Sequence, residues 1–357
     1  MTRLLGRLGL VVAGLGIGLL GAELLARQLY EPPHGSVLLD PQPSLSCYLT
    51  DPEVGYVPRP GVCGRNAHGF LEPDDDLELG PDEQRVVVLG DSIADQDYFP
   101  KMLDAVLDTR LEGGADVLNL GVSGYGTVDE ARWLERWGAR LAPDLVVLQF
   151  CLNDFAVTPV YVEREGQLHE VRVEYRDSMG PSTWLFGRSA LYRAWALRAL
   201  ADEVVVPEDA VEVGLAALAD IAGQVEALDA RLLVVLFPEL AERGTWPKQL
   251  TGTYETVRTA TAELGVPTVD LAPVFEAAGP DQLLLVKARD AMLAREVMVG
   301  GLPDGAALLG ELERILRTSQ PPEAHASDRT HPNPIGHALA TQAMVERIVD
   351  PVDPLLR

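Results

Sequence analysis

The sequence predicts a doubly wound α/β domain, a three-layer sandwich with a central, mostly parallel five-stranded sheet. Five short apolar runs recur between residues 85 and 271, and helical patterns lie between them. Strands that are apolar throughout are typical of parallel sheets, because helices cover both faces of such sheets. Regular alternation of strands and helices predicts right-handed crossovers within one sheet. The 47% hydrophobic and 23% charged content is that of an ordinary globular protein with a real core.

Each expected element has its own stretch of sequence. The five strands are expected in RVVVLGDS (85–92), VLNLGVSG (117–124), LVVLQFCLND (145–154), LLVVLFPE (232–239) and PTVDL (267–271). Helical patterns occupy residues 98–111, 128–141, 211–230 and 253–264. Residues 155–208 and 280–325 lack the alternation and are interpreted as insertions. The first is expected to hold a hairpin and a helix, and the second to be helical.

The N-terminus differs from the rest of the chain. Residues 8–26 contain one charge, Glu23, and five glycines, and Arg3 and Arg7 precede them. This length and composition favour an uncleaved transmembrane signal anchor over a cleaved signal peptide or a buried core helix. The preceding arginines favour a cytoplasmic tail at 1–7. The body would then lie on the extracytoplasmic side of a cell membrane that the chain crosses once.

Residues 27–84 form the expected extracytoplasmic lead-in, which is rich in turn signals. Within it, the stretch from Asn66 to Phe70 is expected to form a turn anchored by the phenylalanine. Cys47 and Cys63 flank part of this lead-in, and an oxidising compartment would permit a bridge between them; two free thiols fit the sequence equally well. Cys151 lies in an apolar run and is interpreted as a buried thiol.

The charge balance excludes several partners. The chain has 29 Lys and Arg against 54 Asp and Glu, a net charge of −25. Residues 1–30 carry three arginines and one glutamate, so the remainder has a net charge of −27. Such a body repels phosphate-rich polymers, which argues against nucleic acids and other anionic polymers as ligands.

Polar and glycine-rich residues cluster at the carboxyl ends of the expected strands, where open α/β sheets bind ligands. Ser92 follows the first strand, and its hydroxyl needs a base to become a nucleophile. His331 can supply that base, and Asp328, three residues earlier, can orient the imidazole. The backbone N–H groups of Ser92 and Gly124 and the amide of Asn153 can stabilise an oxyanion.

These motifs resemble the SGNH (GDSL-type) hydrolases, a family of serine esterases. The matching segments are GDS at 90–92, NLGVSGYGT at 119–127, LND at 152–154 and DRTHPNPIGH at 328–337. The resemblance covers residues 85–345 outside the insertions and implies a flavodoxin-like sandwich over 85–349. It implies Ser92 as nucleophile, His331 as base, Asp328 as its acid, and Gly124 with Asn153 as oxyanion donors. Gly121 is the rival of Gly124. The lead-in also resembles that of membrane-anchored bacterial members that act on acylated glycans.

The expected reaction is hydrolysis of acetyl or other short acyl esters, on small molecules or carbohydrates, through an acyl-enzyme. An O-acyltransferase would use the same residues, and a non-catalytic binding module on this fold is the alternative from another class. No metal or cofactor is expected, because the G-x-G-x-x-G and Walker patterns are absent and no third ligand group accompanies His331 and His337. His337 is interpreted as a packing residue. The oligomeric state is not predicted.

Overall fold

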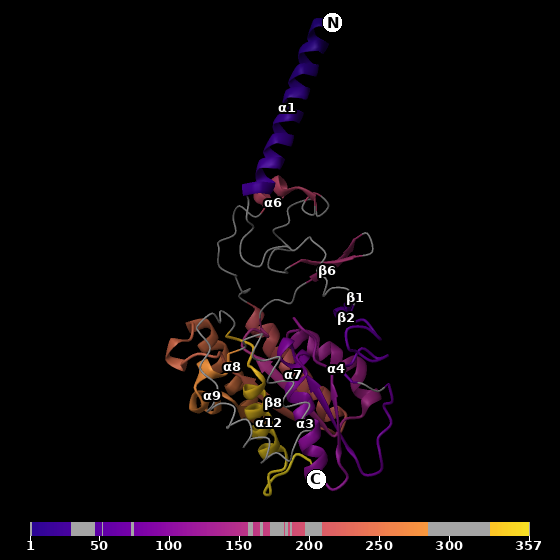
Figure 1. The fold of residues 1–357 in the computed structure, drawn as a ribbon, viewed down its shortest axis with the longest axis vertical. Helices are drawn as coiled ribbons and strands as arrows, with labels where there is room; N and C mark the ends of the chain where they lie inside the picture. Colours follow the sequence, from indigo (N-terminus) through magenta and orange to yellow (C-terminus); the bar gives the residue numbers. More distant parts are fainter. Residues whose placement is uncertain are drawn as a thin grey trace. The chain divides into compact units, whose positions relative to one another are not determined.

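The computed structural model describes residues 2–29, 47–51, 53–72, 75–155, 160–164, 167–171, 182, 185, 188–196, 209–284 and 329–356. The chain forms two compact units, and Figure 1 labels some of their elements. One unit comprises Met1–Ser46 and Val157–Pro207, and the other comprises Cys47–Ala156 and Glu208–Arg357.

A five-stranded parallel sheet is the centre of the larger unit. Its strands are β3 (Gln84–Leu89), β4 (Ala115–Asn119), β5 (Leu145–Cys151), β8 (Arg231–Phe237) and β9 (Thr268–Asp270). They pair in the order β4-β3-β5-β8-β9, and every pairing is parallel. This is the flavodoxin-like order, in which the strand order reverses between the first strand and the third. The predicted fold class is therefore confirmed for the sheet.

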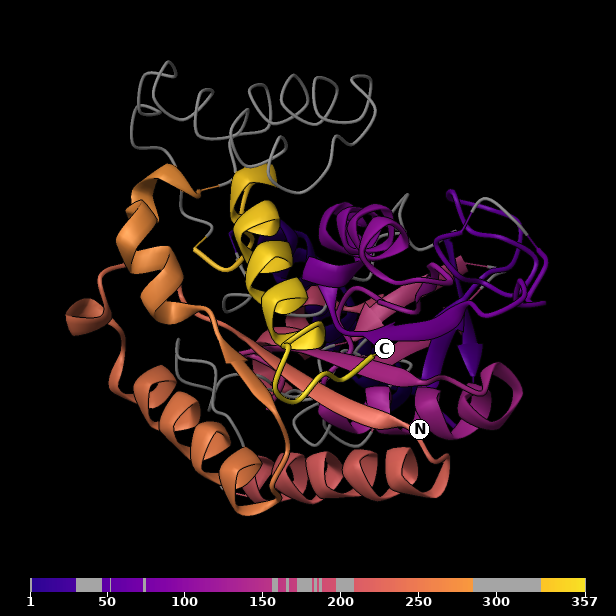
Figure 2. The same cartoon turned by 90° about the horizontal axis from the view of Figure 1, so that it is seen from below.

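Helices cover both faces of this sheet (Figure 2). One layer contains α3 (Tyr98–Arg110), α9 (Ala272–Ala278) and α12 (Pro334–Ile348), and the other contains α4 (Thr127–Leu141), α7 (Ala210–Ala227) and α8 (Lys248–Glu263). Alternate residues of a strand point to opposite faces. In β3, Val86 and Val88 pack in a core cluster with Phe99 of α3, while Val87 is equally buried toward the other face. Burial on both sides explains why these strands are apolar throughout.

The lead-in packs into the larger unit from Cys47 onward. It contains the antiparallel hairpin of β1 (Tyr48–Asp51) and β2 (Gly55–Pro58) and a disulfide between Cys47 and Cys63. The bridge selects one of the two alternatives that the sequence left open. The predicted turn at Asn66 is confirmed: its Oδ1 accepts hydrogen bonds from the backbone N–H of His68 and Phe70, and the Phe70 ring is fully buried. Cys151 is a buried free thiol, as predicted.

The smaller unit contains α1 (Thr2–Leu29), the hairpin of β6 (Val160–Arg164) and β7 (Gln167–Val171), and α6 (Ala190–Ala196). The hairpin and helix predicted for the first insertion are therefore present. The second predicted insertion, 280–325, lies outside the described residues beyond Leu284, so its predicted helical character concerns residues that are not described.

The predicted membrane anchor over residues 8–26 is not confirmed. Among the helices of the described residues, none combines the length and the hydropathy that a membrane crossing requires. Glu23, inside the predicted span, makes polar contacts with the start of α6. Its carboxylate accepts hydrogen bonds from Ser189 Oγ and from the backbone N–H groups of Ala190 and Leu191 at the start of α6, and it pairs with Arg27.

Candidate active site

Ser92 lies at the carboxyl end of β3, as the first residue of the short helix α2 (Ser92–Asp95). The Asp91 carboxylate caps this helix by accepting a hydrogen bond from the Ile93 N–H at 2.8 Å. Gln149 of β5 holds the same turn, because its Oε1 accepts from the N–H groups of Asp91 (3.1 Å) and Ala94 (3.2 Å). The turn is thus fixed from its own first residue and from the neighbouring strand.

His331 lies against this serine. The distance from Ser92 Oγ to His331 Nε2 is 2.6 Å, although 239 residues separate the two in sequence. Such a contact is the geometry that a nucleophile and its base require. Both side chains are partly exposed, so a substrate can reach them.

The backbone around His331 is tied down on both sides. The carbonyl of Arg329 accepts from the Leu240 N–H, and the Asn333 N–H donates to the Leu283 carbonyl, both at 2.7 Å. The Asn333 side chain also caps α12 by accepting from the N–H groups of Ile335 and Gly336. These bonds hold the segment of His331 between two other loops, those at Leu240 and Leu283, and the start of α12.

Asp328, the predicted partner of His331, lies outside the described residues. Its predicted role stays a prediction.

The loop after β4 carries Gly124, and it is bonded to the serine turn, since the Val122 N–H donates to the Gly90 carbonyl at 3.0 Å. Gly124 is exposed and has φ +83°, a left-handed conformation that favours glycine. No described residue accepts a hydrogen bond from its N–H. The rival Gly121 is buried, and its N–H is bound by Asn119 Oδ1 at 2.9 Å. A Cβ at Gly121 would lie 2.6 Å from the Ala94 Cβ, so this glycine serves close packing.

Asn153 lies in the turn after β5, where its side chain is exposed. Because β5 pairs with β3 in parallel, the ends of both strands lie at the same edge of the sheet, where the strand order reverses. The next residue, Asp154, is buried and accepts from the Cys151 N–H at 2.6 Å, which fixes this turn. The structure thus brings Ser92 and His331 into contact and places Gly124 and Asn153 on the two adjoining loops.

Several polar residues behind the site were not predicted. Gln149 is fully buried inside an apolar strand, and that isolated polar residue in LVVLQFC was the available signal. Glu130 and Asp154 are buried as well, and burial raises the pKa of each well above its ordinary value. Repulsion by Asp91 raises the pKa of both further, and Glu130 adds to the effect on Asp154. A carboxyl whose pKa is raised in this way favours the neutral, protonated form.

His337 is a packing residue, as predicted. Its ring stacks on Phe99 at a centroid distance of 5.9 Å, and its Nε2 lies 3.1 Å from Gln96 Oε1. Burial lowers the pKa of His337 to about 3, so the ring is neutral at pH 7. Among the described residues, no three His, Cys, Asp or Glu side chains are arranged to hold a metal ion.

Comparison with solved structures gives distant similarities. The chain is 19% identical to LAE5, an alpha/beta hydrolase from the metagenome of Lake Arreo, over 73% of this chain and 93% of that one, with a TM-score of 0.42. It is 17% identical to Axe2, an acetylxylan esterase from Geobacillus stearothermophilus, over 77% and 96% of the two chains, with a TM-score of 0.40. No curated protein gives a significant match.

A family model gives the stronger result. The model of the GDSL-like lipase/acylhydrolase family matches residues 88–339, more than half of the chain. The matched range begins in β3, just before Ser92, and ends within α12, just after His331. This chain therefore belongs to the GDSL-like lipase/acylhydrolase family and is a carboxylic ester hydrolase.

Proposed function

We propose that the chain is a serine esterase that hydrolyses acetyl or other short acyl esters, including those of carbohydrates, through an acyl-enzyme at Ser92. The observation that carries this proposal is the 2.6 Å contact between Ser92 Oγ and His331 Nε2 at the switch point of the sheet. Gly124 and Asn153 on the adjoining loops support it.

The proposed reaction has two halves. His331 Nε2 takes the proton of Ser92 Oγ as the oxygen attacks the ester carbonyl, and Asp328 accepts the N–H at the other ring nitrogen. The oxyanion that forms is stabilised by the N–H groups of Ser92 and Gly124 and by the Asn153 amide. His331 then protonates the departing alcohol. In the second half, water attacks the acyl-enzyme with His331 again as base, and the acid product leaves.

A polar cavity of about 750 Å³ reaches Arg329 on the segment that carries His331, although Ser92 and His331 are not among its described lining residues, and it supports a hydrophilic alcohol as the leaving group. Its lining includes Glu239, Glu242, Asp281 and Arg329, together with Trp246. Glu239 follows β8 at the carboxyl edge of the sheet, and Arg329 lies two residues before His331. Charged groups and one aromatic ring suit a polyhydroxylated group better than an acyl chain.

We also propose that the esterase domain acts outside the cytoplasm. The Cys47–Cys63 disulfide supports this proposal, because such bridges persist in oxidising compartments. The membrane anchor predicted at 8–26 gives no further support, since the described helices include no membrane span. Fractionation of cells that express the full chain, with thiol labelling before and after reduction, tests it. Cytoplasmic protein with free Cys47 and Cys63 would contradict it.

The test of the activity is hydrolysis of p-nitrophenyl acetate and of acetylated xylo-oligosaccharides by the purified chain. His331→Ala is expected to remove nearly all activity, because Ser92 then has no base. His68→Ala is the matched control, since this histidine packs on Trp137 and contacts Asp75 instead of the serine. Equal activity of His331→Ala and wild type would refute the mechanism. Transfer of acetyl to a labelled sugar in place of hydrolysis would identify an acyltransferase.

A further inference from the structure

The hairpin segment of the lead-in, residues 47–72, contacts the loop that carries Gly124. The Cys47–Cys63 bridge closes this segment, and Arg65 lies two residues after the second cysteine. The Arg65 side chain is only 3% exposed. It forms an ion pair with Asp95 and donates to the carbonyls of Gly69 (3.0 Å) and Gly121 (3.3 Å). The segment is therefore bonded both to α2 and to the loop after β4.

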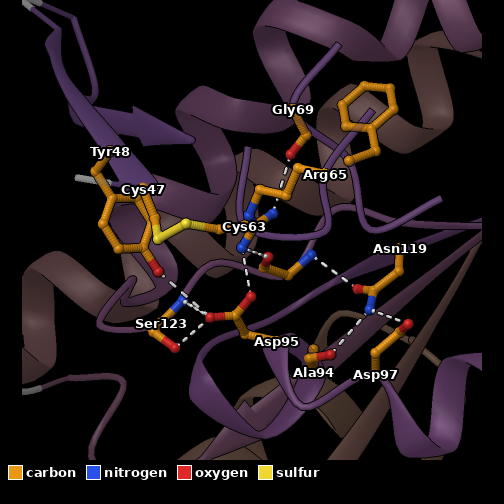
Figure 3. A network of polar contacts seen from close by, with 12 residues as sticks. Cys47, Tyr48, Cys63, Arg65, Gly69, Ala94, Asp95, Asp97, Asn119 and Ser123 are labelled. Atoms are coloured by element: carbon orange, nitrogen blue, oxygen red, sulfur yellow. Dashed lines mark hydrogen bonds and ion pairs between the residues drawn. A yellow bond between two sulfur atoms is a disulfide. The ribbon is translucent and has the colours of Figure 1, made fainter. Parts of the chain in front are cut away.

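Asp95 joins the nucleophile's helix to that loop, as Figure 3 shows. It lies one turn after Ser92 in α2, and its Oδ2 accepts hydrogen bonds from both the hydroxyl and the N–H of Ser123. Tyr48 of β1 donates to the same oxygen at 3.3 Å. Burial raises the pKa of Tyr48 to about 12, so this hydroxyl stays a donor over the range in which esterases work.

The backbone carbonyl of Ser123, its remaining polar group, is held by Tyr56. The Tyr56 hydroxyl donates to the Ser123 carbonyl at 2.6 Å, and its side chain is fully buried. That carbonyl and the Gly124 N–H belong to one peptide unit, and in a trans peptide the two groups point in opposite directions. A bond that fixes the carbonyl therefore also fixes the direction of the Gly124 N–H.

We propose that Tyr56 is a positioning residue for the oxyanion hole: its hydroxyl orients the Ser123–Gly124 peptide so that the Gly124 N–H faces the reacting carbonyl. The Asp95–Ser123 and Arg65–Asp95 contacts hold the same peptide from the nucleophile's side. This inference deepens the proposed function and rests on it. A donated hydrogen bond also polarises the peptide, which strengthens its N–H as a donor.

The test is Tyr56→Phe, which removes the hydroxyl and keeps the ring. The matched control is Tyr254→Phe, which removes another hydroxyl from a fully buried ring, here bonded to Asp270, the last residue of the edge strand β9. Titration with a fluorophosphonate gives the active fraction of each variant. The readouts are kcat and KM for p-nitrophenyl acetate and the inhibition constant of a trifluoromethyl ketone, whose serine adduct carries an oxyanion.

For Tyr56→Phe we expect kcat to fall and the inhibition constant to rise, each by about ten- to a hundred-fold, with KM unchanged. A lower kcat and a higher inhibition constant at unchanged KM identify a loss of oxyanion stabilisation, because partial unfolding would lower only the active fraction. Tyr254→Phe is expected to change none of the three constants. If the wild type is active and Tyr56→Phe changes neither kcat nor the inhibition constant by more than twofold, this inference alone is overturned. A wild type without acyl-transfer activity overturns the proposed function together with it.

Discussion

Gly124 has a conformation that only glycine adopts at low cost. Alanine at φ +83° is strained by about 1 kcal/mol, and relief of that strain would turn the N–H away from its present direction. We expect Gly124→Ala to lower kcat by about tenfold or more, with a small loss of stability.

Gly265→Ala is the matched control for that substitution. Gly265 has φ +68°, is exposed after α8, and has open space where a Cβ would lie. The strain is the same, so the stability loss should match while kcat stays at the wild-type value. Equal kcat for both variants would remove Gly124 from the oxyanion hole.

Glu72 makes stability depend on pH. Burial raises its pKa to about 8, against the lesser effect of the hydrogen bond that its carboxylate accepts from the Asn119 N–H. Asp104 behaves in the same way, with a pKa of about 6 that burial raises. The folded state binds these protons more tightly than the unfolded state. The contribution of Glu72 to stability is therefore complete below pH 4.5 and disappears as the pH rises through about 8. That of Asp104 is complete below pH 3.8 and disappears as the pH rises through about 6.

We expect the free energy of unfolding in urea to fall between about pH 5 and pH 8, and Glu72→Gln to flatten that slope. Glu78→Gln changes an exposed carboxyl of the same segment and serves as the control. A slope that is identical in Glu72→Gln and wild type would show that Glu72 titrates normally.

At the scale of elements, β5 both forms part of the core and holds the turn that carries Ser92. Gln149 accepts two hydrogen bonds from buried backbone N–H groups of the serine turn. Gln149→Met keeps the side-chain length and removes the acceptor, so we expect a loss of about 2–4 kcal/mol in the free energy of unfolding, together with a lower kcat. Leu148→Met, at the adjacent buried position, should cost less than about 1.5 kcal/mol. Equal losses measured in urea would contradict this role of Gln149.

The sequence predicted these elements where the physics is local. The apolar runs become strands because both faces are covered, and the Asn66 turn forms because its side chain bonds two nearby N–H groups. The contacts of Arg65 with Asp95 and of Tyr56 with Ser123 join residues 30 and 67 positions apart. No sequence periodicity marks such pairs, so the sequence did not predict that lead-in residues contact the loops of the candidate active site. The acid partner Asp328 rests on the sequence alone.

At the scale of the whole molecule, the net negative charge should change the rate at which charged substrates approach the site. Repulsion slows the approach of an anionic ester, and salt screens it over a Debye length of about 10 Å at 0.1 M. With a net charge of −25, we expect kcat/KM for an acetylated glucuronate to rise about two- to fivefold from about 10 mM to about 300 mM salt. Neutral p-nitrophenyl acetate should show no such rise. A fall in kcat/KM for the glucuronate with salt would indicate a cationic approach to the site.

The strand order of the larger unit determines where the residues of the candidate active site lie. The order β4-β3-β5 places the Gly124 loop and the Asn153 turn on either side of Ser92. His331 comes from the C-terminal part of the chain, and the hydrogen bond from the Asn333 side chain to the Gln282 carbonyl helps to hold its segment beside Ser92. The motifs of Ser92, Gly124 and Asn153 share one edge of the sheet because the strands that precede them, β3, β4 and β5, are neighbours in a parallel sheet.

Labelling of the purified chain with a fluorophosphonate, followed by peptide mapping, tests the central claim most directly. The account predicts one modified peptide, which carries the label on Ser92, and much slower labelling of His331→Ala. Ser92→Ala should stay unlabelled and inactive. Modification of a different residue, or full esterase activity in Ser92→Ala, would contradict the assignment of Ser92 as the nucleophile.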